Sequence, residues 1–224
     1  MKLEEVVPWG RSLTEYQLMF DLSEQDLNSK ILGCGDGPAS FNAEMTDLGH
    51  SVVSIDPIYQ FSAAQIEQRV RSTYEPVISQ VKQNPHRYIW HNFPNPDELG
   101  ASRLKAMDKF LLDYETGKAT GRYLSQSLPH LDFADRQFDL CVCSHFLFLY
   151  SEQLSLDFHL AAIDELLRIS SEVRIFPLLK LDCKPSPYLE LVMAKLSNKG
   201  YDIQVKSVAY EFQKGGNQML SISR

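Results

Sequence analysis

Residues 30–56 carry the pattern that most limits how this chain can fold. A short apolar run, Ile31-Leu32, enters a glycine-rich stretch at residues 33–39, and a segment with helical character follows. A second apolar run at residues 51–55 then ends at Asp56. Strand, glycine loop, helix, strand and acid form a βαβ unit, so we expect a parallel sheet.

The alternation of strands and helices resumes after residue 121. We expect strands at residues 122–125, 138–143 and 173–179, and helices at 156–169 and from Ser186-Pro187 to Gly200. Residues 203–212 and 218–222 flank Gly215-Gly216-Asn217 and predict a terminal antiparallel hairpin. The fold class is therefore α/β, with a mostly parallel sheet and helices on both faces.

Two further segments lie outside this alternation. Near the amino terminus, Ser12 and Glu15 form a capping-box pattern that predicts a helix through about Phe20. Residues 57–121 form an excursion with expected helices near 62–83 and 101–114. Because the excursion leaves from the carboxyl end of the second strand, we expect it to lie over the ligand cleft.

Composition excludes several classes of protein. The 224 residues are 44% apolar, which is ample for a core, and the formal net charge of −7 argues against a nucleic-acid partner. No run of apolar residues is long enough for a membrane span, and the acids near the start do not fit a secretory signal, so we expect a cytoplasmic protein. Neither the four cysteines nor the six histidines have the spacing of a metal site, and we predict no metal.

The glycine stretch Gly33-Cys34-Gly35-Asp36-Gly37-Pro38-Ala39, followed by the acid at Asp56, resembles that of the class I S-adenosylmethionine-dependent methyltransferases. The resemblance covers nearly the whole chain. It implies a Rossmann-like, doubly wound, seven-stranded sheet with a C-terminal antiparallel hairpin. It also implies a single domain, 1–224, in which residues 1–28 form a helical segment over the cofactor cleft and residues 57–121 a helical substrate lid.

The resemblance implies S-adenosylmethionine as the cofactor and assigns residues to it. Gly35 and Gly37 would let the backbone approach the methionine part, and Asp56 would accept both ribose hydroxyls. Arg11 would clamp the cofactor carboxylate. The remaining expected cofactor contacts are Gly33, Cys34, Pro57, Ser127, Leu128, Ser144 and Tyr16.

Two positions depart from the pattern of that family. Gly33 stands where the family has its opening acid, so the usual anchor for the cofactor amino group is missing. Ser127 replaces a common adenine-contacting acid, although a serine hydroxyl can still bond the adenine amino group.

His145 follows the fourth strand, beside the expected position of the transferring methyl group, and is the predicted catalytic base. A histidine that only caps a helix or bonds in the core is the structural alternative. Tyr150 and Trp90 are expected to contact a small-molecule acceptor. The aromatic cluster around Trp90 favours an apolar acceptor, whereas arginines of the excursion, such as Arg103, favour an anionic one.

Two other functions fit parts of the same pattern. A glycine turn with an acid about 20 residues later is also typical of an NAD-dependent oxidoreductase, but Ser40 stands where that motif has glycine or alanine. The missing acids at positions 33 and 127 also fit a methyltransferase fold that serves only as an interaction protein. The intact Asp56 argues against that reading.

Overall fold

The computed structural model describes residues 9–224 and contains one seven-stranded sheet in the order β3-β2-β1-β4-β5-β7-β6. All neighbouring strands from β3 to β5 are parallel, whereas β7 is antiparallel to both β5 and β6. The strands are β1 (Ile31–Cys34), β2 (Val52–Ile55), β3 (Tyr123–Leu124), β4 (Phe138–Ser144), β5 (Ser170–Phe176), β6 (Asp202–Ser207) and β7 (Gln218–Ser223). The doubly wound fold class predicted from the sequence is confirmed.

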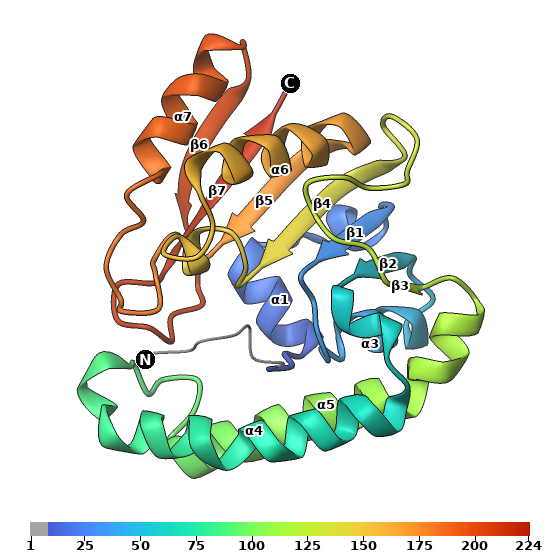
Figure 1. The fold of residues 1–224 in the computed structure, drawn as a ribbon, viewed down its shortest axis with the longest axis vertical. Coiled ribbons are helices and arrows are strands. Elements are labelled where there is room, and N and C mark those ends of the chain that lie inside the picture. The colour runs from blue at the N-terminus through green and yellow to red at the C-terminus, as the bar shows by residue number, and fades with distance from the viewer. Residues whose placement is uncertain (1–8) are drawn as a thin grey trace.

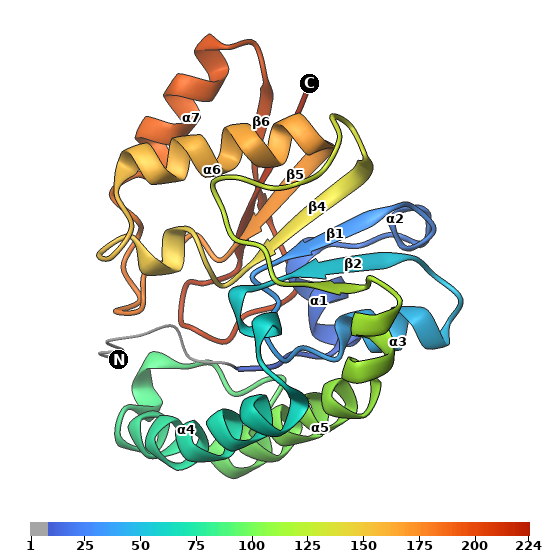
Figure 2. The same cartoon turned by 45° about the vertical axis from the view of Figure 1, so that its right-hand side comes forward.

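Helices cover both faces of this sheet (Figures 1 and 2). They are α1 (Leu13–Phe20), α2 (Glu24–Leu27), α3 (Phe41–Asp47), α4 (Ala63–Gln83), α5 (Pro96–Ala119), α6 (Leu156–Ile169) and α7 (Leu189–Asn198). Short 3₁₀ helices occupy Pro57–Gln60, Pro85–Arg87 and Phe148–Tyr150.

Alternating residues of a strand contact helices on opposite faces of the sheet. Cys141 and Cys143 of β4 pack with Leu166 and other apolar residues of α6 and α7. Leu140 and Val142 of the same strand pack on the opposite face, with side chains of α1 and α3. Because successive side chains of a strand point to opposite faces, one apolar strand supplies both cores.

The α1 helix begins as its sequence predicts. The Ser12 hydroxyl accepts a hydrogen bond from the Glu15 N–H, and the Glu15 carboxylate accepts one from the Ser12 N–H at 3.1 Å. Only residues 9–28 of the predicted N-terminal segment lie among the described residues, and residues 1–8 lie outside them.

Residues 57–121 fold mainly into α4 and α5, which lie side by side beneath the carboxyl ends of the parallel strands (Figure 1). The pair is joined to the sheet through buried aromatic residues, among them Tyr59, Phe110 and Tyr123. The α5 helix is longer at both ends than the predicted 101–114, because Asn95 caps it and Pro96 occupies its first turn. The Asn95 side chain accepts a hydrogen bond from the Glu98 N–H at 2.9 Å.

The predicted terminal antiparallel hairpin is confirmed, but its first strand is shorter than the predicted 203–212. β6 ends at Ser207, and residues 208–217 form a loop before β7. Burial explains the early end of the strand: the Tyr210 side chain is 1% exposed and packs edge-on against Phe176, 5.8 Å between ring centroids. The loop is also tied to the excursion, because the Ile89 N–H donates to the Phe212 carbonyl at 2.8 Å.

Candidate functional site

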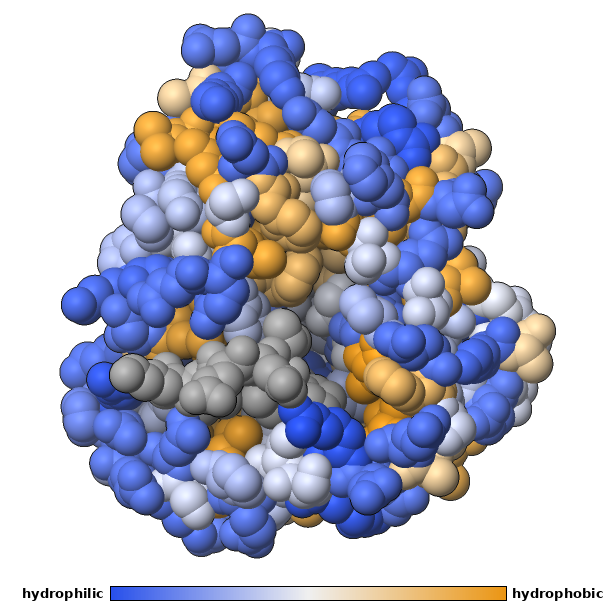
Figure 3. All heavy atoms as spheres, in the orientation of Figure 1, coloured by the Kyte–Doolittle hydropathy of each residue, from blue (hydrophilic) through white to orange (hydrophobic). Residues whose placement is uncertain are grey.

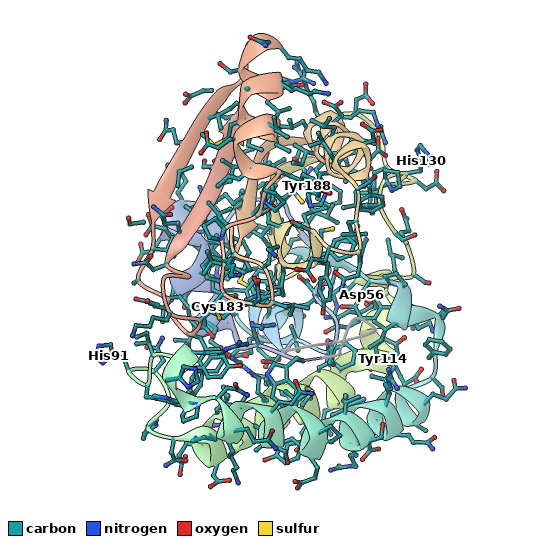
Figure 4. The ribbon with its side chains drawn as sticks, turned by 60° about the vertical axis from the view of Figure 1, so that its left-hand side comes forward. Asp56, His91, Tyr114, His130, Cys183 and Tyr188 are labelled. Atoms are coloured by element: carbon teal, nitrogen blue, oxygen red, sulfur yellow. The ribbon has the colours of Figure 1, made fainter. Side chains whose placement is uncertain are left out.

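A cavity of about 730 Å³ opens at the carboxyl ends of β1, β2 and β4. Its walls come from the glycine loop, the ends of β2 and β4, the α4–α5 pair, the loop at residues 208–217 and residues 9–11. In open α/β sheets this edge is where ligands bind, because the chain leaves neighbouring strands in different directions there. Figure 4 shows Asp56 between the sheet and the α4–α5 pair, whereas His91 and His130 lie at the periphery.

Most of the predicted site residues line this cavity. They are Arg11, Cys34, Gly35, Gly37, Asp56, Pro57, Ser127, Leu128, His145 and Tyr150. These residues come from five separate parts of the sequence, and the fold brings them to one wall.

Four predicted residues do not line the cavity. Gly33 is buried within β1, and Tyr16 and Ser144 lie behind the wall, where each is bonded to a residue that does line it. Trp90 also lies off the wall, because its indole N–H donates to the Pro85 carbonyl at 3.2 Å. Its neighbour Tyr88 lines the cavity instead.

The glycine loop needs glycine at two positions for different reasons. Gly35 and Gly37 have φ values of 70° and 54°, in the left-handed region that other residues rarely adopt. At Gly35 a β-carbon would also press on Phe146 and the Ser144 carbonyl, whereas at Gly37 the nearest atom would be an Asp56 oxygen at 3.9 Å. Gly35 therefore packs against the segment after β4, and Gly37 leaves open space beside Asp56.

Asp56 shapes the same loop. One carboxylate oxygen accepts the Gly37 N–H at 3.0 Å, and the other accepts the Ile58 N–H at 2.9 Å. Burial raises the pKa of Asp56 to about 6, although these two hydrogen bonds act in the opposite direction. The acid at the end of β2 is thus held by backbone at a fixed place on the cavity wall.

Asp36 is a site residue that the sequence analysis missed. Its carboxylate accepts hydrogen bonds from the Tyr16 hydroxyl at 2.7 Å and the Ser54 hydroxyl at 2.6 Å. Burial raises its pKa to about 7. A β-carbon at Gly33 would collide with this carboxylate, so Asp36 fills the space that a side chain at position 33 would take. The acid that the pattern lacks at position 33 is replaced by one three residues later.

This relationship gives Gly33 a packing role, because its missing side chain leaves room for the Asp36 carboxylate. The signal in the sequence was the pair itself: a glycine where an acid is usual, and an acid between the two glycines of the loop.

His145 follows the last residue of β4 and has a φ of 50°. Its backbone N–H donates a hydrogen bond to the Phe176 carbonyl at 2.7 Å. Its Nδ1 lies 3.1 Å from the Ser144 hydroxyl. Burial, and then the charges of Arg11 and Arg103, hold the pKa of His145 well below its usual value. The imidazole is therefore neutral near pH 7 and available as a proton acceptor.

Arg103, on α5, is buried and also lines the cavity. It is 1% exposed, pairs with Glu15 at 2.5 Å, and donates to the Tyr210 hydroxyl at 3.2 Å. The Tyr210 hydroxyl in turn donates to the other Glu15 oxygen at 3.0 Å. Burial alone would raise the pKa of Glu15, but the charge and hydrogen bonds of Arg103 outweigh it and leave the pKa lowered, so Glu15 is ionised.

Cys34, Cys141 and Cys143 are all buried and unbridged. Cys34 pairs with Cys143 in the register of β1 and β4, and hydrogen bonding to Cys143 together with burial raises the pKa of Cys34 well above its usual value. Burial raises the pKa of Cys141 as well, so Cys34 and Cys141 stay in the less reactive thiol form.

The described residues contain neither a metal-binding cluster nor a membrane-spanning helix. Residues 9–224 contain no cluster of three or more histidine, cysteine, aspartate or glutamate side chains arranged to hold a metal ion. Over the same residues, no helix has both the length and the apolar character needed to cross a membrane. The face in Figure 3 is mainly hydrophilic over α4.

A relative described as the uncharacterized protein MJ0045 of Methanocaldococcus jannaschii is 35% identical to this chain over 225 residues, spanning 100% of this chain and 99% of the relative. No family model matches the chain.

Solved structures with a similar arrangement share little sequence with it. The magnesium protoporphyrin IX methyltransferase of Synechocystis, with bound S-adenosylmethionine, is 13% identical with a TM-score of 0.47, over 90% of this chain and 73% of that one. A putative S-adenosylmethionine-dependent methyltransferase of Methanococcus maripaludis is 9% identical, with a TM-score of 0.47. The match covers 95% of this chain and 83% of that one. The fold assignment rests on the strand order of this chain itself.

Proposed function

This chain belongs to the same family as protein MJ0045 of Methanocaldococcus jannaschii, and from the chemistry of its cavity we propose that it is an S-adenosylmethionine-dependent methyltransferase acting on a small-molecule acceptor. The observation that carries the proposal is the set of Asp36, Asp56 and Arg11 on one wall around an open glycine loop. The terminal antiparallel strand that the family resemblance implies is also present.

The residues of this wall fit the parts of the cofactor. Asp56 offers two carboxylate oxygens at the end of β2, as the pair of ribose hydroxyls requires. Asp36 offers a carboxylate for the amino group. Arg11 offers N–H donors for the carboxylate, since among the described residues its guanidinium makes one hydrogen bond, from Nη1 to the Trp9 carbonyl at 3.0 Å. Ser127 and Leu128 line the part of the wall assigned to the adenine.

When bound, S-adenosylmethionine supplies a methyl group on a sulfonium, which a nucleophile displaces in line. The protein then has to align the acceptor, exclude water and take a proton where the nucleophile carries one. Neutral His145, at the end of β4, is the group placed to accept that proton, and the Phe176 carbonyl and Ser144 hydroxyl fix its position. Tyr150, beside it on the wall, contacts the acceptor.

Residues 9–28 and the α4–α5 pair complete the cleft in this proposal. Trp9 stacks on Tyr74 of α4 with ring centroids 6.3 Å apart, and the Arg11 carbonyl accepts the Ser40 N–H at 3.0 Å. The N-terminal segment thus bridges the glycine loop and the excursion. We assign the excursion the role of the substrate lid.

The proposal is tested by calorimetric titration of the protein with S-adenosylhomocysteine, 5′-methylthioadenosine and NAD. We expect micromolar binding of the first, lost in Asp56→Ala, and no binding of NAD. Methylthioadenosine lacks the amino-acid part of the cofactor. Arg11→Met should therefore weaken the binding of S-adenosylhomocysteine by about tenfold or more and leave the binding of methylthioadenosine unchanged.

An exposed arginine of α4 provides the matched control. Arg71→Met removes a guanidinium that pairs with Glu67 outside the cavity and should change neither affinity. Binding of NAD in preference to S-adenosylhomocysteine would favour an oxidoreductase. Binding of neither would favour the non-catalytic interaction protein, and each result contradicts the proposal.

A further inference from the structure

The cavity is long enough for two molecules placed end to end. Its lining includes both Ile66 and Val81, which are fifteen residues apart on α4, a separation of roughly 22 Å at the helical rise of about 1.5 Å per residue. Ile66 belongs to the core around Tyr59, which lies three residues after Asp56, whereas Val81 belongs to a separate aromatic cluster with Tyr88. The glycine loop and Asp56 lie at the first end, where the Tyr59 hydroxyl donates to the Gly37 carbonyl at 2.7 Å.

The far end of the cavity is apolar. Its wall is formed by Val77 and Val81 of α4, Leu99 of α5, Tyr88 and Phe212. Tyr88 and Phe212 stack with ring centroids 4.6 Å apart, and Phe93 packs edge-on against Phe212. A surface of this kind favours the hydrocarbon or aromatic body of a ligand.

One buried cation adjoins this apolar surface. The Arg103 guanidinium lies over the Phe93 ring, 5.1 Å from its centroid, and lines the cavity. It is the one charged lining residue that α5 contributes among the described residues. A ligand whose body lies along Phe212 and Tyr88 therefore has a positive charge beside one end.

The hydrogen bonds of Arg103 are incomplete. Of its five N–H groups, those of Nη1 serve Glu15 and the Gly10 carbonyl, and Nη2 serves only the Tyr210 hydroxyl. Within residues 9–224 its Nε has no hydrogen-bond partner, and neither does the Nε of Arg11. Buried donors are almost always paired, so a guanidinium with spare donors on a cavity wall indicates an acceptor brought by a ligand.

The neighbouring carboxyl groups do not supply that acceptor. The Glu15 carboxylate already accepts hydrogen bonds from Arg103, the Tyr210 hydroxyl and the Ser12 N–H. Asp36 and Asp56 are bonded to Tyr16, Ser54 and loop N–H groups, and to neither arginine. Among the described residues, Glu15 is the one carboxylate paired with Arg103, and no carboxylate forms an ion pair with Arg11.

We propose that the methyl acceptor is an apolar or aromatic carboxylic acid, with its carboxylate at Arg103 and its body against Leu99, Val81, Tyr88 and Phe212. This inference rests on the proposed function in one respect, because it assigns Arg11 to the cofactor and leaves Arg103 for the acceptor. The carboxylate is a recognition group, since pairing with a guanidinium lowers its nucleophilicity.

Two probes of the same shape and different charge test the proposal. 1-Naphthaleneacetate and 1-naphthaleneacetamide are titrated calorimetrically into the protein, both alone and saturated with S-adenosylhomocysteine. We expect the acetate to bind about tenfold or more tightly than the amide, because a charge-assisted hydrogen bond replaces a neutral one. Equal affinities for the two probes, or binding of neither, would overturn the proposal.

Variants locate the preference at Arg103. Arg103→Gln alone leaves Glu15 buried without its cation, so the double variant Glu15→Gln/Arg103→Gln is also made, and it removes both charges together. Each variant that folds should bind the two probes equally, whereas Arg103→Lys should retain part of the preference. Arg71→Gln, on the outer face of α4, should behave as the unmodified protein.

The titrations with S-adenosylhomocysteine separate this proposal from the proposed function. A protein that prefers the acetate without binding S-adenosylhomocysteine keeps the anion site and loses the methyltransferase assignment. If the Arg103 variants instead lose S-adenosylhomocysteine and keep their preference for the acetate, Arg103 serves the cofactor and the proposal is wrong.

Discussion

The Asp36 carboxylate occupies the space that a β-carbon on Gly33 would need. Tyr16 and Ser54 hold it there through hydrogen bonds of 2.7 and 2.6 Å. The glycine and the acid are therefore one feature of the loop, in which neither residue can change alone without affecting the other.

A double-mutant cycle tests this dependence. Gly33→Ala should lower the free energy of unfolding by about 1–3 kcal/mol, because the added methyl group overpacks the site. In an Asp36→Gly background the same change should cost little, since the colliding carboxylate is gone. Urea unfolding of the four proteins gives the coupling, and an equal cost in both backgrounds would show that Asp36 is not the cause.

Asp36 also predicts how stability depends on pH. Its pKa is about 7 in the folded protein against a usual 3.8, so the fold favours the protonated acid. This contribution is complete below about pH 4 and is lost as the pH rises through 7, because the unfolded chain ionises first. Asp36→Asn cannot ionise, so its stability relative to the unmodified protein should rise progressively between about pH 4 and 7.

Urea unfolding of the two proteins at three pH values measures this trend. Asparagine also loses one acceptor for Tyr16 or Ser54, but that cost is the same at every pH. A stability difference that does not change with pH would therefore contradict the raised pKa of Asp36.

The charges near His145 predict its titration. Burial, Arg11 and Arg103 all disfavour the imidazolium, so the pKa of His145 should lie well below its usual value of 6.5. NMR of the histidine ring signals, assigned with His145→Gln, checks this directly. A midpoint near the usual value of 6.5 would show that the site is more solvated than the structure indicates.

The α5 helix provides a matched pair for testing how the excursion is held. Phe110 is fully buried against Tyr59 and Tyr123, and Phe110→Ala should cost about 3–5 kcal/mol of unfolding free energy. Leu112, two residues along, is 88% exposed, and Leu112→Ala should stay within about 0.5 kcal/mol. Similar costs for the two changes would mean that α5 does not pack as described.

Local sequence patterns predicted most of the elements. The capping box at Ser12 and Glu15 and the helix at Leu156–Ile169 appear where they were expected. These signals are reliable because they depend on residues close together in the chain. The first strand of the terminal hairpin was predicted too long, because Tyr210, within the expected strand, makes buried hydrogen bonds with Arg103 and Glu15 that the local sequence does not reveal.

The sequence alone determined the βαβ unit, the order of strands and helices, and the acid at the end of β2, since periodicity and glycine placement depend on neighbouring residues. Only the tertiary structure decided which groups share the cavity. It placed Asp36 in the space beside Gly33 and brought Arg103 of α5 against Glu15 of α1, 88 residues away. Contacts of this range arise from packing between elements, and no pattern within either segment specifies them.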